Sequence, residues 1–443
     1  MTKKISVINK IYKILFFFIL CALIIAISIL IYRSEFVYLG SQRYYFFNYI
    51  VILLLIIFLN FFLYFKKKFY IFIILLISAF ALENFLFIYK TYTEVEYQRY
   101  KLAKKNGLIF DRRNKLEVYN DLKKNNTNIT IAQTPHIFIN NSMKILNTSI
   151  NPITNSSGHK IVIHCNESGK WVTYKSDRYG FNNQDNVWDY SEVDIALIGD
   201  SFTLGACVTV EENIASQLRV ISKKKIINGG VGGTGPLIQL AIFREYFLKK
   251  KPRKVFYFFF EGNDMNDLNI ELTDPVLKRY LNIEFSQNLT LYKSVISNNF
   301  FFLKTNDNKI LDRFKFLTLR NFILKIYKNF KYKNNIQKNN NAELNLIIDM
   351  LNKDIKNYNG QLYFVYLPAF SRYDISNTDF NNELIFKKNE ILNLIKKKDI
   401  TVIDIDNAIF RKEIHPKTFF NFEVDGHYNA NAYKKIAEYI SKF

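Results

Sequence analysis

Three long apolar runs occupy most of the first ninety residues of this 443-residue chain. They contain no proline and few charges, and each is close to the roughly 20 residues that a helix needs to cross the hydrocarbon of a bilayer. The pattern predicts an N-terminal anchor, residues 1–92, with three transmembrane helices at about residues 14–32, 46–65 and 69–89.

Flanking cations predict the orientation of these helices. Lysines precede the first run and separate the second from the third, which places both lysine clusters in the cytoplasm. After three crossings, the rest of the chain is expected on the extracytoplasmic side of a cytoplasmic (inner) membrane. Glu83, inside the third run, leaves an alternative open: if that run does not cross, the large domain lies in the cytoplasm.

The net charge of +22 does not by itself indicate a nucleic-acid partner. Part of the excess comes from the anchor and part from residues 303–340, and no nucleic-acid-binding motif is recognisable. We therefore expect no nucleic acid as a partner. A basic surface facing the lipid bilayer or an acidic polysaccharide remains open.

The three cysteines do not form a disulfide framework. Cys21 lies in the first apolar run. Cys165 and Cys207 are able to pair in an oxidising compartment, but the sequence does not say how far apart they are. No CxxC or histidine-rich spacing is present, so we expect no metal and no cofactor.

Regular alternation of strands and helices begins near residue 193, after a lead-in region, residues 93–190, of unknown fold. Apolar strands are expected at residues 194–198, 225–228, 254–260, 361–367 and 401–405. Amphipathic helices lie between them, as in βαβ units, which predicts an α/β domain with a mostly parallel sheet over residues 191–443. A Lys/Asn-rich stretch at about residues 268–341 reads as an insertion in this domain.

Four polar clusters lie at the ends of these strands or immediately before a helix. In an open parallel sheet such positions converge beyond the carboxyl ends of the strands. The clusters are Gly199-Asp200-Ser201, the glycine-rich 228–235, Glu261-Gly262-Asn263-Asp264, and Asp425-Gly426-His427.

In these blocks the chain resembles the SGNH hydrolases, also called the GDSL family. That family carries a Ser in a GDS motif, then a Gly, then an Asn in a GxND motif, and an Asp and a His near the C-terminus. All four blocks occur here in that order, and more narrowly the chain looks like bacterial membrane-anchored members with an outer SGNH domain. The resemblance implies a three-layer SGNH-type fold for residues 191–443.

The resemblance also implies roles for particular residues. Ser201 is the expected nucleophile, His427 the base that takes its proton, and Asp425 the carboxylate that stabilises the imidazolium. The backbone N–H groups of Ser201 and Gly233 and the side-chain amide of Asn263 are the expected oxyanion-hole donors.

The chain departs from the family pattern at two places. Glu261 stands where the family usually has Gly, which narrows the pocket or adds a charge. Asp425 precedes His427 by two residues instead of three, and Glu423 is also near, so the role of Asp425 is open. The resemblance implies that Asp200 orders its turn, and Asp264 and Glu261 are expected to support the site.

The combined prediction is a membrane-anchored serine esterase that acts on acyl esters, with an O-acylated envelope glycan as the expected substrate. One alternative is an O-acyltransferase of the same fold that passes the acyl group to a glycan hydroxyl and receives it from a membrane donor protein. Another is a catalytically silent glycan-binding or scaffold protein.

Overall fold

The computed structural model describes residues 95–140, 143–145, 148–292, 340–373 and 378–443, with shorter pieces before residue 95 and between residues 316 and 326. The chain divides into two compact units. The larger unit comprises Glu94–Leu303 and Lys338–Phe443, and the smaller comprises Met1–Thr93 and Lys304–Gln337.

A five-stranded parallel sheet forms the centre of the larger unit, with strand order β10-β9-β8-β6-β7. Each predicted strand is confirmed to within two residues: β6 (Ile195–Gly199), β7 (Ile226–Gly230), β8 (Lys254–Phe260), β9 (Gln361–Leu367) and β10 (Thr401–Asp404). The chain runs from β6 to β7 on one side and then to β8 on the other. This reversal makes the carboxyl ends of β6 and β8 a topological switch point, where open α/β sheets bind ligands.

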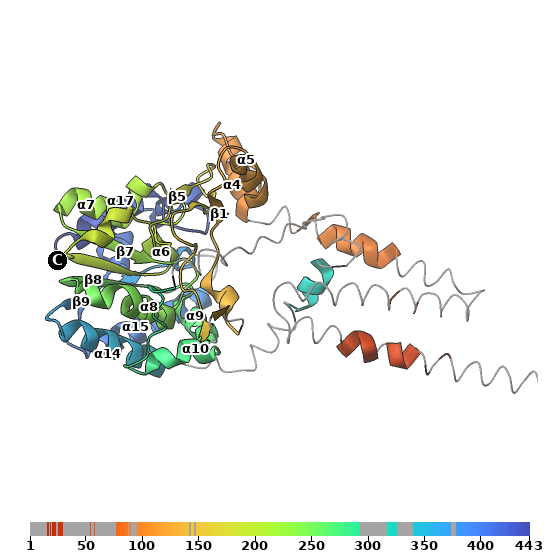
Figure 1. Ribbon diagram of the computed structural model, residues 1–443. Helices are drawn as coiled ribbons and strands as arrows, with labels where there is room; N and C mark the ends of the chain where they lie inside the picture. The colour runs from red at the N-terminus through yellow and green to blue at the C-terminus, as the bar shows by residue number, and fades with distance from the viewer. Residues whose placement is uncertain are drawn as a thin grey trace, which may run out of the picture. The chain divides into compact units, whose positions relative to one another are not determined.

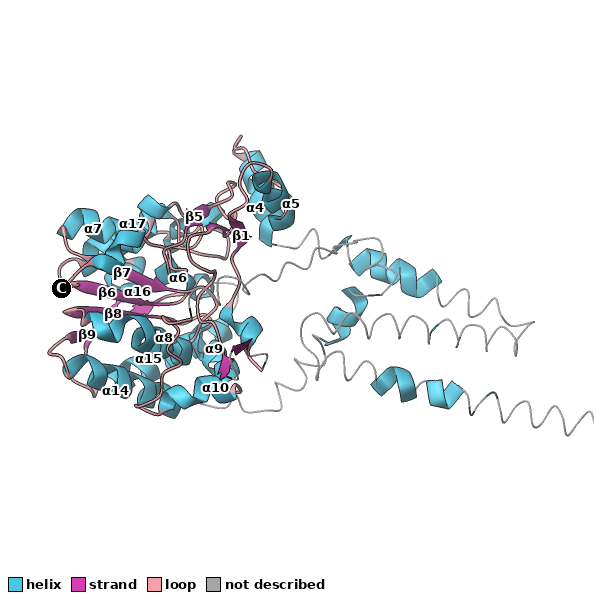
Figure 2. Cartoon of the chain, viewed as in Figure 1, coloured by secondary structure: helices cyan, strands magenta, loops and turns pink. Residues whose placement is uncertain are grey.

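Helices cover both faces of the sheet, as expected for a three-layer fold (Figures 1 and 2). One face is covered by α7 (Ile214–Ser222) and α17 (Ala430–Ile440), and the short α6 (Ser201–Leu204) and α16 (Ile405–Ala408) follow β6 and β10. The other face is covered by α8 (Pro236–Ile242), α14 (Asn341–Lys356) and α15 (Thr378–Lys396).

Strand β8 shows why the sheet needs both layers. Its side chains alternate between the two cores: Tyr257 and Phe259 pack in the cluster with α8 and α14, while Phe256 and Phe258 pack in the cluster with α7 and α17. All four are 1% exposed or less. A strand that is buried on both faces has a continuous run of apolar residues in its sequence, as β8 does.

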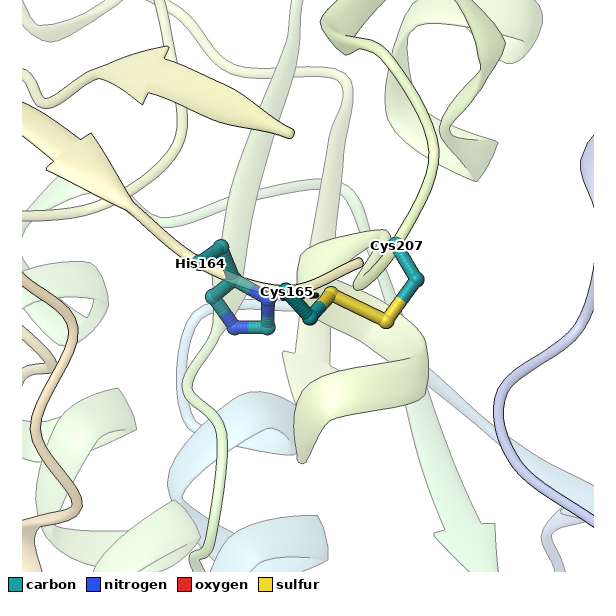
Figure 3. A group of neighbouring side chains, drawn as sticks. All are labelled: His164, Cys165 and Cys207. Carbon is teal, nitrogen blue, oxygen red and sulfur yellow. Dashed lines mark hydrogen bonds between the residues drawn. A yellow bond between two sulfur atoms is a disulfide. The ribbon is translucent and has the colours of Figure 1, made fainter. Parts of the chain in front are cut away.

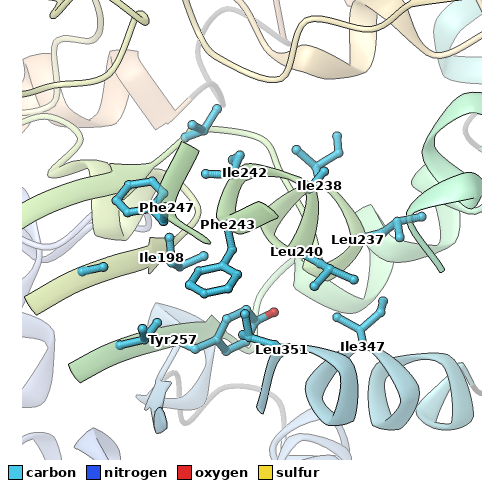
Figure 4. Close-up of a cluster of buried hydrophobic side chains, with 14 of the residues drawn as sticks. Ile198, Leu237, Ile238, Leu240, Ile242, Phe243, Phe247, Tyr257, Ile347 and Leu351 are labelled. Atoms are coloured by element: carbon cyan, nitrogen blue, oxygen red, sulfur yellow. The ribbon is translucent and has the colours of Figure 1, made fainter. Parts of the chain in front are cut away.

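The apolar stripes of the amphipathic helices are buried. Figure 4 shows Leu240, Phe243 and Phe247 of the segment that follows β7 packed over Ile198 and Tyr257 of the sheet. On α14, the buried apolar side chains are Leu344, Ile347, Ile348, Leu351 and Ile355. These stripes are explained by packing alone.

The described residues of the lead-in region belong to the larger unit. They form the helices α4 (Val95–Lys105) and α5 (Lys115–Lys123), a hairpin and a small sheet. The hairpin pairs β2 (Met143–Ile145) with β3 (Thr148–Ile150), and the sheet has the order β1-β4-β5, with β1 (Ile129–Ile131), β4 (Ile161–Ile163) and β5 (Thr173–Lys175).

Buried hydrogen bonds join the end of the lead-in region to β7. The Asn183 side chain donates to Asn228 O at 2.9 Å and accepts from Asn228 N at 3.0 Å. Asp177 is fully buried and accepts from Asn183 Nδ2 at 3.0 Å and from Trp188 Nε1. Burial raises the pKa of Asp177 to about 6, against these hydrogen bonds, which lower it.

The predicted insertion begins later than its composition suggested. Residues 268–292 belong to the larger unit and include the end of α9 (Asp264–Glu271) and all of α10 (Pro275–Lys278). Leu277, Tyr280 and Leu289 are buried, and Glu245 accepts a hydrogen bond from the Tyr280 hydroxyl at 2.6 Å. Residues 268–292 contain one lysine and three asparagines, and their buried apolar side chains pack on the core.

The prediction of three transmembrane helices is contradicted. Among the residues that the structure describes, no helix has the length and apolar character that crossing a membrane requires. Run 46–65 lies almost wholly outside the described residues, as do parts of runs 14–32 and 69–89. The predicted anchor, and the multi-pass inner-membrane location derived from it, are therefore withdrawn.

Within the smaller unit, the Glu83 carboxylate is hydrogen-bonded to the backbone. Its carboxylate is 1% exposed and accepts hydrogen bonds from the backbone N–H groups of Thr318, at 2.9 Å, and Leu319, at 2.6 Å. These contacts satisfy the buried carboxylate, which the sequence analysis placed within an apolar run.

Replacing Phe243 should destabilise the larger unit strongly. Its ring is fully buried against the sheet, so Phe243→Ala should lower the free energy of unfolding by about 3–5 kcal/mol through lost contacts and a cavity. Val220→Ala on α7, where the side chain is 65% exposed, should change it by about 0.5 kcal/mol or less. Urea unfolding followed by circular dichroism measures both. Equal losses for the two variants would contradict the assigned core.

Candidate active site

Ser201 is the first residue of α6 and follows β6 after one intervening residue. That residue, Asp200, caps the helix by accepting a hydrogen bond from Phe202 N at 2.9 Å. The turn is tight: a Cβ on Gly199 would lie 2.2 Å from Thr203 Oγ1 and 2.9 Å from Phe258 O. The turn therefore requires glycine, and it leaves Ser201 at the carboxyl end of the sheet, partly exposed.

The imidazole of His427 lies against Ser201. Its Nε2 is 2.9 Å from Ser201 Oγ, although the two residues are 226 positions apart in the sequence. The ring of Phe202 packs beside the imidazole, with ring centroids 4.9 Å apart. Two residues on, Asn429 caps α17 by accepting a hydrogen bond from Ala432 N at 3.1 Å.

Glu167 holds the other side of the imidazole. Its Oε1 lies 3.0 Å from His427 Nδ1, and its Oε2 accepts a hydrogen bond from the backbone N–H of His427 at 2.7 Å. Glu167 belongs to the loop of residues 164–172 between β4 and β5, in the lead-in region. One carboxylate therefore positions both the ring and the backbone of His427.

Arg99 on α4 contacts the same carboxylate. Its guanidinium is 3.2 Å from Glu167 Oε2, and the two side chains are 6% and 11% exposed. Burial by itself raises the pKa of Glu167, but the hydrogen bonds and charge of His427, together with the charge of Arg99, outweigh it and leave the pKa below its usual value. Glu167 is therefore ionised at neutral pH.

The ionised state of Glu167 determines where the imidazole proton lies. A carboxylate without a proton can only accept hydrogen bonds, so Nδ1 of His427 carries the hydrogen and donates it to Glu167. Nε2 then presents a lone pair that accepts the hydroxyl hydrogen of Ser201. This tautomer is the one that can remove a proton from the serine.

The structure does not bring the carboxylate of Asp425 into the position expected for it. The backbone carbonyl of Asp425 accepts a hydrogen bond from Arg99, and burial raises the pKa of its carboxyl group. The place beside His427 is occupied instead by Glu167. Packing there is so close that a Cβ on Gly426 would lie 2.4 Å from Glu167 Oε2.

The glycine-rich loop after β7 passes beside Ser201. A Cβ on Gly232 would lie 3.5 Å from Ser201 Cβ, and the Gly232 N–H is taken by Asn155 Oδ1 at 2.6 Å. The next residue, Gly233, has a φ of +70°, and its carbonyl accepts from Thr134 Oγ1 at 3.0 Å. A Cβ there would lie 2.5 Å from that hydroxyl oxygen, so the position requires glycine.

Asn263 follows β8, the strand beside β6 in the sheet. Its Nδ2 donates to Asp267 Oδ2 at 2.8 Å, which orients the amide and leaves its second hydrogen for another acceptor. Ser201, Gly233 and Asn263 therefore follow three adjacent strands, β6, β7 and β8, at one edge of the sheet. This arrangement agrees with the convergence expected from the sequence.

The three supporting carboxylates, those of Asp200, Asp264 and Glu261, lie in different environments. Burial raises the pKa of Asp200 to about 6, and it raises the pKa of Asp264 well above its usual value, with the charge of Asp200 adding to the rise. Glu261 does not line the site. It is enclosed by the guanidinium of Arg372, the hydroxyl of Tyr366 and the backbone N–H of Ala369, so it ties β8 to the segment after β9.

Cys165 and Cys207 form a disulfide, which settles a question that the sequence left open (Figure 3). Their Cα atoms are 5.3 Å apart. Both groups of possible metal ligands in the described residues include Cys207, one with His164 and Cys165 and the other with Glu167 and His427. In the disulfide its sulfur is not the thiolate that metals bind.

Glu167 and Arg99 are the site residues that the sequence analysis missed. Both lie in the lead-in region, outside the blocks that resemble the SGNH family. One signal was available: Cys165 is two residues before Glu167, and Cys207 is six residues after Ser201. A pairing of these cysteines would have placed Glu167 near the nucleophile.

No family model and no curated relative matches this chain, but several solved structures are similar to it. A structure described as a lipolytic protein of the G-D-S-L family, from Desulfitobacterium hafniense DCB-2, is 15% identical with a TM-score of 0.33, over 57% of this chain and 99% of that one. The acetyl xylan esterase AlAXEase is 12% identical with a TM-score of 0.33, over 56% and 98%.

A third structure, described as an acylhydrolase from Bacteroides fragilis NCTC 9343, is 12% identical with a TM-score of 0.30, over 56% of this chain and 85% of that one. At these identities and TM-scores, the activity is inferred from the geometry of the site itself.

The two candidate carboxylates can be separated by mutation. Glu167→Gln should lower kcat by about 10²–10⁴-fold, because a neutral amide no longer stabilises the imidazolium and no longer selects the working tautomer. Asp425→Asn, the matched control, should retain most of the activity. Steady-state ester hydrolysis across a pH series measures both, and in Glu167→Gln the acidic limb of the profile should move to lower pH. A larger loss in Asp425→Asn than in Glu167→Gln would reverse the assignment.

Proposed function

We propose that this protein is a serine ester hydrolase that works through an acyl-enzyme on Ser201. One observation carries the proposal: a continuous series of hydrogen bonds from Ser201 Oγ through both nitrogens of His427 to Glu167, at 2.9 Å and 3.0 Å. Nucleophile, base and carboxylate stand in the order that acyl transfer by a serine requires.

The first half of the reaction forms the acyl-enzyme. Ser201 Oγ attacks the carbonyl carbon of the ester while its proton moves to Nε2 of His427. The negative charge of Glu167 stabilises the resulting imidazolium. When the tetrahedral intermediate collapses, the bond to the alcohol breaks and His427 returns the proton to the departing alkoxide oxygen.

The second half repeats these steps with water as the nucleophile. His427 takes a proton from the water, the acid is released and Ser201 is regenerated. In both halves the carbonyl oxygen becomes negatively charged. The backbone N–H groups of Ser201 and Gly233 and the amide of Asn263 are proposed to donate to it, and one such donor typically contributes about 2.7–4 kcal/mol.

The identity of the acyl acceptor distinguishes the proposed hydrolase from its alternative. A sugar hydroxyl in place of water would make the protein an O-acyltransferase with the same acyl-enzyme. We keep O-acylated glycan as the substrate to test first. Incubating the protein with an acetylated glycan and an unacetylated acceptor, then measuring free acetate and acetylated acceptor, separates the two reactions.

Ser201→Ala should abolish the hydrolysis of 4-nitrophenyl acetate, with a loss of about 10⁴-fold or more, because the nucleophile is removed. Wild-type protein treated with a fluorophosphonate should gain one adduct, found on the peptide that contains Ser201. Thr209→Ala, an exposed hydroxyl outside the site, is the control and should react normally. Hydrolysis by Ser201→Ala at the wild-type rate would exclude Ser201 as the nucleophile. No hydrolysis above background in either protein would favour a silent binding protein.

A groove of about 650 Å³ lies beside the segment that leads to His427, and its lining suggests which groups the substrate carries. It reaches Asp425, two residues before His427, and one face of α4, the helix that carries Arg99. Its lining combines apolar side chains with three lysines and two carboxylates, so cationic groups are in excess. The lining residues are Gln98, Lys101, Leu102, Lys105, Phe370, Lys417, Glu423, Val424 and Asp425. We propose that it binds an ester with an apolar body and a negative charge.

Reversing two charges in the groove tests this proposal. Lys101→Glu with Lys105→Glu should raise KM for the anionic ester 4-acetoxybenzoate by about 5–20-fold, since two attractions become repulsions, and the effect should shrink at high salt. KM for neutral 4-nitrophenyl acetate should stay near the wild-type value. Lys224→Glu, an exposed lysine just before β7 and so at the opposite edge of the sheet, is the control. Equal changes for both esters would contradict the proposed charge preference.

A further inference from the structure

The Cys165–Cys207 disulfide lies beside His427 and joins the chain segments that carry Glu167 and Ser201. Cys165 is two residues before Glu167, and Cys207 is six residues after Ser201. The sulfur of Cys207 also lies 3.4 Å from His427 Nδ1, the nitrogen that donates to Glu167. Figure 3 shows the bond joining the segment after β4 to the segment after α6.

The disulfide connects two separate sheets. Glu167 is carried by the loop between β4 and β5 of the small sheet, whereas Ser201 follows β6 of the five-stranded sheet. The triad therefore works only if the two sheets keep a fixed relative position at this point. Catalytic geometry tolerates displacements of well under 1 Å, so such a junction needs firm support.

Apart from the hydrogen bonds between Glu167 and His427, the hydrogen bonds of the 164–172 loop described here bind it within the lead-in region. Its base is closed by two backbone hydrogen bonds between its own ends, His164 N to Val172 O at 3.0 Å and Val172 N to Cys165 O at 2.8 Å. Asn166 Nδ2 donates to Asp111 O at 2.6 Å, and Asp111 N donates to Gly169 O at 2.8 Å. These bonds order the loop but do not attach it to the Ser201 segment.

We propose that the Cys165–Cys207 disulfide is a positioning element of the catalytic site that keeps Glu167 in register with His427 and Ser201, so that catalysis depends on the redox state of this pair. The inference rests on the proposed esterase function. A dithiol reductant supplies two electrons and two protons, the S–S bond breaks to give two thiols, and the dithiol closes to its own disulfide. The Glu167 loop then loses its covalent tie to the Ser201 segment.

The test uses the full chain with Cys21→Ser, which leaves Cys165 and Cys207 as its two cysteines. Non-reducing digestion and mass spectrometry should find the peptide pair joined by these residues. Reduction by a dithiol, with a chelator present, should lower kcat for 4-nitrophenyl acetate by about tenfold or more and leave KM nearly unchanged. Circular dichroism should show that the fold is retained. The double variant Cys165→Ser with Cys207→Ser should behave like the reduced protein and should not respond to the dithiol.

Coupling to Glu167 separates positioning from general stabilisation. If the disulfide acts through Glu167, reduction should have little further effect in Glu167→Gln, because interacting residues are not additive. Reduction that leaves kcat unchanged, or that lowers it equally in wild type and Glu167→Gln, would overturn the proposal. A loss that appears only without chelator would also overturn it, since capture of a metal by the freed thiols would then be the cause.

The esterase function is judged separately in the same samples. Fluorophosphonate labelling of Ser201 in the oxidised protein tests the function, whereas the change in labelling rate on reduction tests the role of the disulfide. Normal labelling that reduction does not alter would remove the disulfide proposal alone. Absence of labelling in the oxidised protein would remove the proposed function.

Discussion

The hydrogen bonds of His427 hold three distant segments of the chain in one arrangement. One ring nitrogen faces Ser201, 226 positions away, and the other faces Glu167, 260 positions away. Because the imidazole is rigid, its two nitrogens lie in fixed directions, and both contacts form only when the turn after β6 and the loop after β4 are correctly placed. The hydrogen-bond geometry of the His427 side chain therefore depends on how both sheets pack.

The carboxylates near His427 are buried, so their charges have a large energetic effect. A carboxylate withdrawn from water is costly unless a cation and hydrogen-bond donors accompany it. Glu167 has both, from Arg99 and from the ring and backbone of His427. Asp200, by contrast, has one oxygen without a hydrogen-bond partner, and burial raises its pKa. The site thus has an ionised carboxylate, Glu167, hydrogen-bonded to the base. A more readily protonated carboxylate, Asp200, is next to the nucleophile in the sequence.

Side-chain periodicity predicted the sheet and its helices well, for a physical reason. Strand β8 buries both faces, so it had to be apolar throughout, and the stripe at Leu240, Phe243 and Phe247 had to face the core. Composition was a poorer guide. The Lys/Asn-rich composition of residues 268–341 taken together hid the packed face of residues 268–292. Hydropathy over the first ninety residues predicted membrane helices that the described residues do not form.

The lead-in region shows a second limit of sequence reasoning. Its strands have only three residues each and carry no long periodic pattern, so the sequence analysis assigned it no fold. It nevertheless contributes Arg99, Asn155 and Glu167 to the site. Short elements of this kind acquire their structure from the contacts they make, here with the loops of the larger sheet.

Sequence by itself determined which residue types stand at the ends of the strands: Ser201 after a glycine turn, Gly233 where a side chain would not fit, Asn263, and His427 before the last helix. These positions follow from local backbone geometry, which neighbouring residues encode. Only the tertiary structure decided which carboxylate completes the site. Asp425 is two residues from His427 yet contacts Arg99 through its backbone, whereas Glu167 is 260 residues away and reaches Nδ1, because the direction of a side chain depends on the packing of both sheets and not on distance along the chain.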